Sequence, residues 1–262
     1  MQRRSKVKNG PDIDERYCRQ IALKEIGQAG QRRLASSTAI VIGVGGLGTH
    51  SAGLLARSGV GRLILVDGQT VELSNLHRQV LYEEDDLGQP KAAVAAERLS
   101  KANSRVDIIA IIEEVDKQSL DGLLDGVDVL VDGTDNMAVR QAINLCCVRK
   151  KMPWVFGGVA QTTGMSMTIV PGKTPCLSCV FPSDKGTGII TSRHSQGPSS
   201  RAILGTVPAM VGAIQATEAL KLLLGRPPRK GLLSIDAWTG VSRVLDITFN
   251  KSCPVCGKAQ PK

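Results

Sequence analysis

The stretch AIVIGVGGLGTHSAGLLARSGVGRLILVD, residues 39–67, decides the fold class. Its apolar run at 39–42 is typical of a buried strand, a helical pattern follows at 46–58, and a second apolar run covers 62–66. A glycine-rich turn, Gly43-Val44-Gly45-Gly46-Leu47-Gly48, joins the first strand to the helix. Glycines at this point allow a tight turn and let a phosphate approach the backbone N–H groups of the helix N-terminus. The stretch therefore predicts a nucleotide-binding strand–turn–helix–strand unit.

The alternation of strands and helices continues beyond this stretch. Strands are expected at 106–112 and 128–131, with helices at 91–103 and 138–151. Such alternation predicts a parallel sheet covered by helices on both faces. After residue 151, glycine-containing turns between the apolar runs indicate antiparallel strands, interrupted by one helix, with strands at 154–159, 165–170, 232–236 and 241–249 and the helix at 204–224.

The remaining segments complete the predicted fold. Helical patterns at 14–26 and 31–34 form an N-terminal arm, and short helices are expected near 75–79 and 120–124. Residues 182–201, PSDKGTGIITSRHSQGPSSR, lack periodicity and are rich in Gly, Ser and Pro, so we expect a mobile loop at the rim of a site. The fold class is α/β, a Rossmann-like doubly wound, mostly parallel sheet continued by antiparallel strands.

Charge and composition exclude several classes of protein. The 262 residues carry a net charge of +9, with 42% hydrophobic and 22% charged residues, which is typical of a folded globular chain. There is no apolar run of about eighteen residues and no secretion signal, so we expect a cytoplasmic protein without a membrane span. The basic residues are dispersed and accompany no nucleic-acid-binding motif, so nucleic acid is not the expected partner. The charge is expected to form a basic solvated surface, and an acidic protein or a polyphosphate is an alternative to nucleic acid as its partner.

The residues after the glycine turn choose between two kinds of nucleotide. Asp67 ends the second strand and could accept hydrogen bonds from a ribose, which by itself would favour NAD or FAD. Farther along, Asn75, Arg78 and Lys91 supply donors to anionic oxygens, and Asp135 follows a strand end where it could hold Mg²⁺. Hydride transfer does not need two fixed cations and a metal-binding acid. This set favours a nucleoside triphosphate.

The cysteines give a second signal. Two C-x-x-C pairs, Cys176/Cys179 and Cys253/Cys256, predict one structural, tetrahedral Zn²⁺ site that joins distant parts of the chain. The rival interpretation, a pair of redox motifs, is disfavoured because neither pair lies at a strand–helix junction. The other cysteines, at positions 18, 146 and 147, are expected to pack in the core.

Several motifs in fixed order resemble those of one protein family. The chain contains RYCRQI, GVGGLG, VDGQTVELSNLHRQ, GQPK, GTDN, PCLSC and CPVCG in this order. They resemble the MoeB, ThiF and HesA proteins, the ubiquitin-activating-enzyme-like adenylyltransferases. The resemblance spans about residues 14–257, and PCLSCVFP with SCPVCG is most similar to HesA.

The resemblance implies a set of site residues. Catalysis would involve Arg78, Lys91, Asp135 and Arg19, the last reaching the ATP of a neighbouring subunit in a homodimer. The nucleotide and its Mg²⁺ would be bound by Gly43, Gly45, Gly46, Gly48, Asp67, Asn75, Arg78, Gln79, Lys91, Asp135 and Asn136. The chain would form a single domain over 1–262, with a helical arm at 1–37, a nucleotide-binding part at 38–151 and a carrier-binding and zinc part at 152–262.

The resemblance also implies the chemistry. The C-terminal Gly-Gly carboxylate of a small ubiquitin-like sulfur-carrier protein would react with ATP to give an acyl adenylate for sulfur transfer, with a separate sulfurtransferase as a further partner. Such a reaction needs positioning and charge neutralisation more than acid–base catalysis. Some relatives carry a reactive cysteine in the crossover loop, whereas this chain has no cysteine between Cys179 and Cys253. We therefore expect no covalent bond between carrier and enzyme.

Three other functions remain open from the sequence. A related enzyme that adenylates a peptide or takes part in a tRNA base modification would share the ATP site. An NAD-dependent oxidoreductase would share the glycine turn and is disfavoured by Arg78, Lys91 and Asp135. A nonenzymatic zinc scaffold would share the cysteines and would not need an intact nucleotide site.

Overall fold

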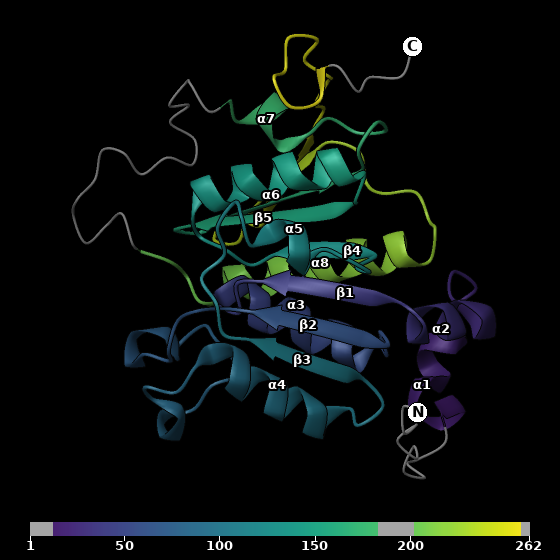
Figure 1. Ribbon diagram of the computed structural model, residues 1–262, viewed down its shortest axis with the longest axis vertical. Coiled ribbons are helices and arrows are strands. Elements are labelled where there is room, and N and C mark those ends of the chain that lie inside the picture. The colour runs from purple at the N-terminus through teal and green to yellow at the C-terminus, as the bar shows by residue number, and fades with distance from the viewer. Residues whose placement is uncertain (1–12, 183–201, 258–262) are drawn as a thin grey trace.

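One sheet organises the part of the chain that the computed structural model describes, residues 13–182 and 202–257 (Figure 1). Its eight strands lie in the order β3-β2-β1-β4-β5-β6-β7-β8. They are β1 Thr38–Ile42, β2 Arg62–Val66, β3 Asp107–Ile111, β4 Val129–Asp132, β5 Trp154–Ala160, β6 Thr163–Ile169, β7 Leu232–Asp236 and β8 Val241–Leu245. The mobile loop expected at 182–201 lies, apart from Pro182, outside the described residues.

The direction of the strands changes half-way across the sheet. From β3 to β5 every pairing is parallel, and from β5 to β8 every pairing is antiparallel. Helical crossovers connect the parallel strands, whereas β5 and β6 are joined by a short turn in which Gln161 has φ 53°. The predicted fold class, a parallel sheet continued by antiparallel strands, is confirmed.

Helices cover both faces of the sheet. They are α1 Ile13–Ile21, α2 Gly27–Ala35, α3 Gly46–Arg57, α4 Lys91–Ala102, α5 Leu120–Leu123, α6 Met137–Lys150, α7 Leu177–Val180 and α8 Thr206–Leu223, with 3-10 turns at Leu73–Asn75 and Glu84–Asp86. Side chains of α3, α4 and α8 join one buried cluster, and those of α5 and α6 join a second. The sheet is therefore doubly wound.

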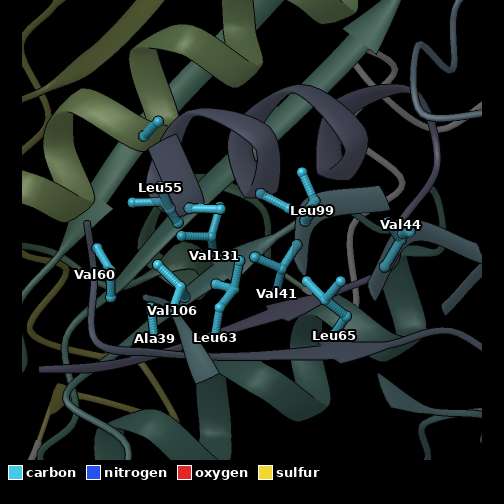
Figure 2. Close-up of a cluster of buried hydrophobic side chains, with 14 of the residues drawn as sticks. Ala39, Val41, Val44, Leu55, Val60, Leu63, Leu65, Leu99, Val106 and Val131 are labelled. Carbon is cyan, nitrogen blue, oxygen red and sulfur yellow. The ribbon is translucent and has the colours of Figure 1, made fainter. Parts of the chain in front are cut away.

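Alternation along the central strand explains the two clusters. In β1, Ala39 and Val41 point into the first cluster, whereas Ile40 and Ile42 point into the second. Figure 2 shows the first cluster, which contains Val41 and Val131 of neighbouring strands and Leu55 of α3. Because both faces of β1 are buried, its sequence is a continuous apolar run.

The predicted boundaries near residues 26, 31 and 249 are wrong, and Cys18, which was expected to pack in the core, is exposed on α1. The helix expected at 14–26 ends at Ile21, because the chain then forms tight turns, and α2 starts at Gly27, where φ is +61°. The last strand was expected to reach residue 249 but ends at Leu245. Leu245 pairs with Leu232, the first residue of β7, so the residues beyond it have no strand to pair with.

A buried ion pair fixes the carboxyl end of β4. Arg140 of α6 donates through Nε to Oδ2 of Asp132 at 3.0 Å, and the two side chains are 5% and 0% exposed. The same guanidinium donates to the backbone oxygens of Thr134 and, at 2.8 Å, Gly157. Asp132 also accepts hydrogen bonds from the backbone and hydroxyl of Thr134. One arginine therefore ties the loop after β4 to helix α6 and strand β5.

We expect Arg140→Leu to lower the free energy of unfolding by about 3–5 kcal/mol, because Asp132 would be left buried without its counter-charge. Urea unfolding measures the loss. The matched control is Arg149→Leu, on the same helix, where the ion pair with Asp121 is 60% and 50% exposed. An exposed pair contributes about 0.2–1 kcal/mol, so equal losses in the two variants would contradict the assignment.

Candidate active site and metal centre

The glycine turn between β1 and α3 contains glycines that the fold itself requires. Gly43 has φ +84°, and a Cβ there would lie 2.7 Å from the carbonyl carbon of Gly133. A Cβ on Gly48 would lie 1.9 Å from the Gly43 oxygen, and one on Gly133 would lie 2.0 Å from the same atom. The turn, the first turn of α3 and the loop after β4 thus pack backbone against backbone, which no side chain permits.

Gly45 is different, because the fold alone does not demand it. A Cβ at this position would meet only Nε2 of Gln79, at 3.6 Å. Gly45 is the N-cap of α3, and no side chain caps this helix end. The bare turn therefore leaves room for a ligand beside the N–H groups of a helix N-terminus, a place that suits an anionic group.

Asp67, at the end of β2, supports this turn. Its Oδ2 accepts a hydrogen bond from the Val44 N–H at 2.7 Å, and its Oδ1 accepts one from the Gln69 N–H at 2.8 Å. The side chain that the sequence assigns to a ribose thus also fixes the shape of the glycine turn.

Lys91 brings together residues that are distant in the sequence. It is 4% exposed, and its Nζ donates to Oε1 of Gln69 at 2.8 Å. Burial lowers the pKa of Lys91, whereas the carboxylates of Asp67, Glu72 and Asp135 act to raise it, and Arg78 acts to lower it. Charges from the stretch between β2 and α4 and from the loop after β4 therefore act on one ammonium group at the carboxyl ends of the parallel strands, where such sheets bind ligands.

Two buried carboxamides lie in the same region. Asn75 is 7% exposed and Gln79 is 3% exposed, and among the described residues the side-chain oxygen of neither has a hydrogen-bond partner. Buried oxygens without a donor are unfavourable. Both side chains are therefore suited to accept hydrogen bonds from the hydroxyl or amino groups of a ligand.

The other residues predicted to bind the nucleotide, Arg78, Asp135 and Asn136, are less buried than Lys91. Arg78 donates to the Ser74 carbonyl oxygen at 2.9 Å and contacts the ring of His77. Asp135 is exposed in the loop after β4, where its carboxylate can reach a ligand. The Asn136 side chain instead caps α6, accepting from the Ala138 N–H at 2.8 Å.

Arg19 does not join this group. It is exposed on α1, whose neighbouring residue Gln20 donates to the Ser58 carbonyl oxygen at 3.0 Å, beside the start of β2. Asn103, just before β3, donates to the Tyr17 hydroxyl at 2.7 Å. Helix α1 thus lies at the amino ends of the parallel strands, opposite the glycine turn of the same chain (Figure 1).

Sequence reasoning missed four residues that shape the site. Gln69 and Tyr82 contact Lys91, and Asp132 and Arg140 hold the loop that carries Asp135. Two motifs gave a signal: VDGQTVELSNLHRQ contains Gln69, and GTDN directly follows Asp132.

The four predicted metal-binding cysteines converge. The Sγ atoms of Cys176, Cys179, Cys253 and Cys256 all lie within 4.8 Å of one another. Three of their separations are 3.4, 3.6 and 4.0 Å. Four sulfurs around one Zn²⁺ at 2.3 Å would be about 3.8 Å apart, so the arrangement suits such an ion.

The protein around the cysteines is built to hold them. Asn144 of α6 accepts from the Leu177 N–H at 3.0 Å and donates to the Ser178 hydroxyl, fixing the knuckle of the first pair. The Gly257 N–H donates to the Cys253 carbonyl oxygen at 2.9 Å and closes the second. Burial raises the pKa of the Cys176 thiol to about 11, so a bound cation would be needed to stabilise its thiolate.

Comparison with known proteins identifies the family. The ThiF family matches residues 17–255. This chain belongs to the ThiF family. The family implies ATP and Mg²⁺ as ligands of the site, and the cysteine cluster can hold a metal ion.

Curated relatives of this ThiF-family chain are similar over nearly their whole length. SAMP-activating enzyme E1 of Haloferax volcanii is 39% identical over 246 residues, covering 93% of this chain and 89% of that protein. The sulfur carrier protein adenylyltransferase of Thermus thermophilus is 38% identical over 250 residues, covering 93% and 90%. The heterocyst HesA protein of Trichormus variabilis is 37% identical over 249 residues, covering 94% and 90%.

Solved structures agree with this family assignment. Escherichia coli MccB, in its structure with MccA-N7isoASN, has a TM-score of 0.80 to this chain at 26% identity, covering 92% of this chain and 75% of MccB. The family match and the curated relatives confirm an enzyme of the adenylyltransferase class. Within the described ranges 13–182 and 202–257, no helix combines the length and hydropathy needed to cross a membrane.

Two glycine variants separate the ligand site from the fold. We expect Gly45→Ala to fold with nearly wild-type stability and to weaken MgATP binding by about 1–3 kcal/mol, because its methyl group fills ligand space. Gly48→Ala should lose about 3 kcal/mol or more of folding stability, because its methyl group meets the Gly43 oxygen. Thermal unfolding and titration calorimetry measure both effects, and unchanged nucleotide binding by Gly45→Ala would contradict the assignment.

Proposed function

We propose that this protein is an ATP-dependent adenylyltransferase that activates the C-terminal Gly-Gly carboxylate of a ubiquitin-like sulfur-carrier protein for sulfur transfer in cofactor or tRNA thiolation. The observation that carries the proposal is the meeting of the glycine turn, Lys91 and the acid-bearing loop after β4 at one edge of the sheet. Support for the substrate comes from the Thermus thermophilus relative, which is named a sulfur carrier protein adenylyltransferase.

The described residues suit the parts of MgATP. The N–H groups at the start of α3, together with Lys91 and Arg78, face the phosphates and neutralise their charge. Asp67, Asn75 and Gln79 offer acceptors to the nucleoside. Asp135 holds Mg²⁺, which when bound neutralises phosphate oxygens and favours departure of pyrophosphate.

The proposed reaction is a substitution at phosphorus. A carboxylate oxygen of the carrier forms a bond to the α-phosphorus, the bond from that phosphorus to the bridging oxygen breaks, and pyrophosphate leaves with the electron pair. The nucleophile is already an anion, so no general base is required. What the enzyme supplies is alignment and fixed positive charge, and this matches a site with Lys91 and Arg78.

A homodimer would complete the site. Arg19 lies opposite the glycine turn of its own chain, so we propose that it reaches the ATP of a second copy. The exposed position of Arg19 on helix α1 supports this role. Adenylation at full rate by a protein that sedimentation analysis shows to be a monomer would contradict the composite site.

We further propose that the enzyme is cytoplasmic and works with a separate sulfurtransferase. We also propose that its single domain has three parts: the helical arm, the nucleotide-binding part and the carrier-binding and zinc part.

The cysteine cluster is proposed to bind structural Zn²⁺. Cys176, Cys179, Cys253 and Cys256 would fill all four positions of a tetrahedral ion and leave none for a substrate. When bound, the ion supplies a crosslink between α7 and the C-terminal segment.

A second candidate substrate is a short peptide. The similarity in fold to MccB, which was solved with MccA-N7isoASN and has a TM-score of 0.80 to this chain, supports this second candidate. The two candidates differ in the acid that becomes activated, while the ATP site stays the same.

Isotope exchange between pyrophosphate and ATP tests the substrate. We expect exchange only when a carrier ending in Gly-Gly is present, and none with the same carrier lacking its last two residues. Lys91→Ala should slow the exchange, with an activation free energy raised by about 2–4 kcal/mol, because a preorganised cation is lost. Exchange with a free peptide and none with the carrier would favour the second candidate.

Metal analysis tests the cysteine cluster. We expect one Zn²⁺ per chain, and about none in Cys253→Ser, with a lower unfolding temperature and residual ATP binding, because the ion stabilises the second half of the sheet. Cys147→Ser is the matched control, since Cys147 is buried but lies outside the cluster. Full zinc occupancy in Cys253→Ser would contradict the proposed ligand set.

A further inference from the structure

A closed ring of hydrogen bonds surrounds the base of the nucleotide site. It runs from Val44 of the glycine turn to Asp67, then to Gln69, Lys91 and Tyr82, and back to Val44. The Val44 N–H donates to Asp67 at 2.7 Å, Asp67 accepts from the Gln69 N–H at 2.8 Å, and the Tyr82 hydroxyl lies 2.7 Å from the Val44 carbonyl oxygen. The ring joins segments that the sequence places far apart.

Tyr82 closes this ring. Its side chain is 5% exposed, and its hydroxyl shares one proton between the carbonyl oxygens of Val44, at 2.7 Å, and Lys91, at 3.2 Å. Burial and the nearby carboxylates of Asp67 and Asp86 raise the pKa of Tyr82, so the hydroxyl stays protonated and remains a donor. One phenol thus fixes the glycine turn against the first residue of α4.

Gln69 fixes Lys91 at both its ends. The Lys91 N–H donates to the Gln69 carbonyl oxygen at 2.9 Å, and the Lys91 ammonium donates to the Gln69 side-chain oxygen at 2.8 Å. A lysine has a flexible four-carbon chain, so an ammonium without such a partner would be distributed over several rotamers. Gln69 removes that freedom before any nucleotide binds.

From this geometry we infer that Tyr82 and Gln69 are positioning residues for the nucleotide: Tyr82 sets the distance from the glycine turn to α4, and Gln69 places the Lys91 ammonium beside that turn. The inference deepens the proposed function and rests on it for the role of Lys91. Neither residue needs to touch the reacting atoms. Preorganised charge is effective because little reorganisation remains when the ligand arrives.

The pH dependence of nucleotide binding can report on the position of the Lys91 ammonium, because several charges face that group. These are the carboxylates of Asp67, Glu72 and Asp135 and the guanidinium of Arg78. Nucleotide binding that needs the charged ammonium weakens as the pH rises through the pKa of Lys91. Gln69→Leu removes an acceptor of the charged form, so this alkaline loss should move to lower pH. Gln69→Glu keeps an acceptor and adds negative charge, so the loss should move to higher pH.

Titration calorimetry of the full chain with MgATP, repeated across alkaline pH, tests the inference. We expect Kd near neutral pH to rise about five- to tenfold in Gln69→Leu and in Tyr82→Phe, as for loss of a hydrogen bond in a preorganised site. Thr174→Val is the matched control. It removes another buried hydroxyl that bridges two backbone groups, the Val170 N–H and the Thr168 carbonyl oxygen, outside the nucleotide site.

The outcomes are distinguishable. Opposite shifts of the alkaline loss in the two Gln69 variants, with unchanged Kd in Thr174→Val, support the positioning role. Wild-type Kd values in Gln69→Leu and Tyr82→Phe, or an alkaline loss that does not move, would overturn it while leaving the proposed function intact. A wild-type chain that binds no MgATP would overturn both. Carrier-dependent pyrophosphate exchange, measured separately, decides the substrate alone.

Discussion

The backbone contact between the glycine turn and the loop after β4 is the constraint on which the site depends. Gly43, Gly48 and Gly133 approach so closely that a methyl group on any of them would overlap backbone atoms of another segment of the chain. This contact puts the N-terminus of α3 beside the loop that carries Asp135. The carboxylate proposed to hold Mg²⁺ and the helix end proposed to face the phosphates therefore lie on neighbouring segments of the backbone.

Helix α6 connects the loop after β4 with the cysteine cluster. Near its start, Arg140 holds Asp132 and the loop after β4, and farther along Asn144 holds the first cysteine knuckle. The guanidinium of Arg140 also lies 5.2 Å from the centre of the Phe156 ring, in the same buried cluster as the cysteines. The loop that carries Asp135 and the cysteine cluster are thus both attached to helix α6.

The sequence predicted the features that follow from local pattern. Strand–helix alternation, the glycine turn and the paired cysteines each have a short-range signature, and their arrangement is as expected. Gln69, Tyr82 and Arg140 were missed because their value depends on which distant residue they meet, and no spacing rule reveals that. The end of β8 was misjudged for a similar reason, since its length is set by its partner strand and not by its own apolar residues.

The separation of the two cysteine pairs has a consequence for the order in which the chain is completed. Cys176 and Cys253 are 77 residues apart, and between them lie α8, β7 and β8. In a loop-closure description, a crosslink over such a distance raises the free energy of the unfolded chain by about 4.5 kcal/mol. An ion bound by the unfolded chain would avoid this loop-closure cost only if it contacted a single C-x-x-C pair. Both pairs lie close together in a sheet that already contains β7 and β8, so coordination of an ion by all four sulfurs would require the second half of the sheet to be in place.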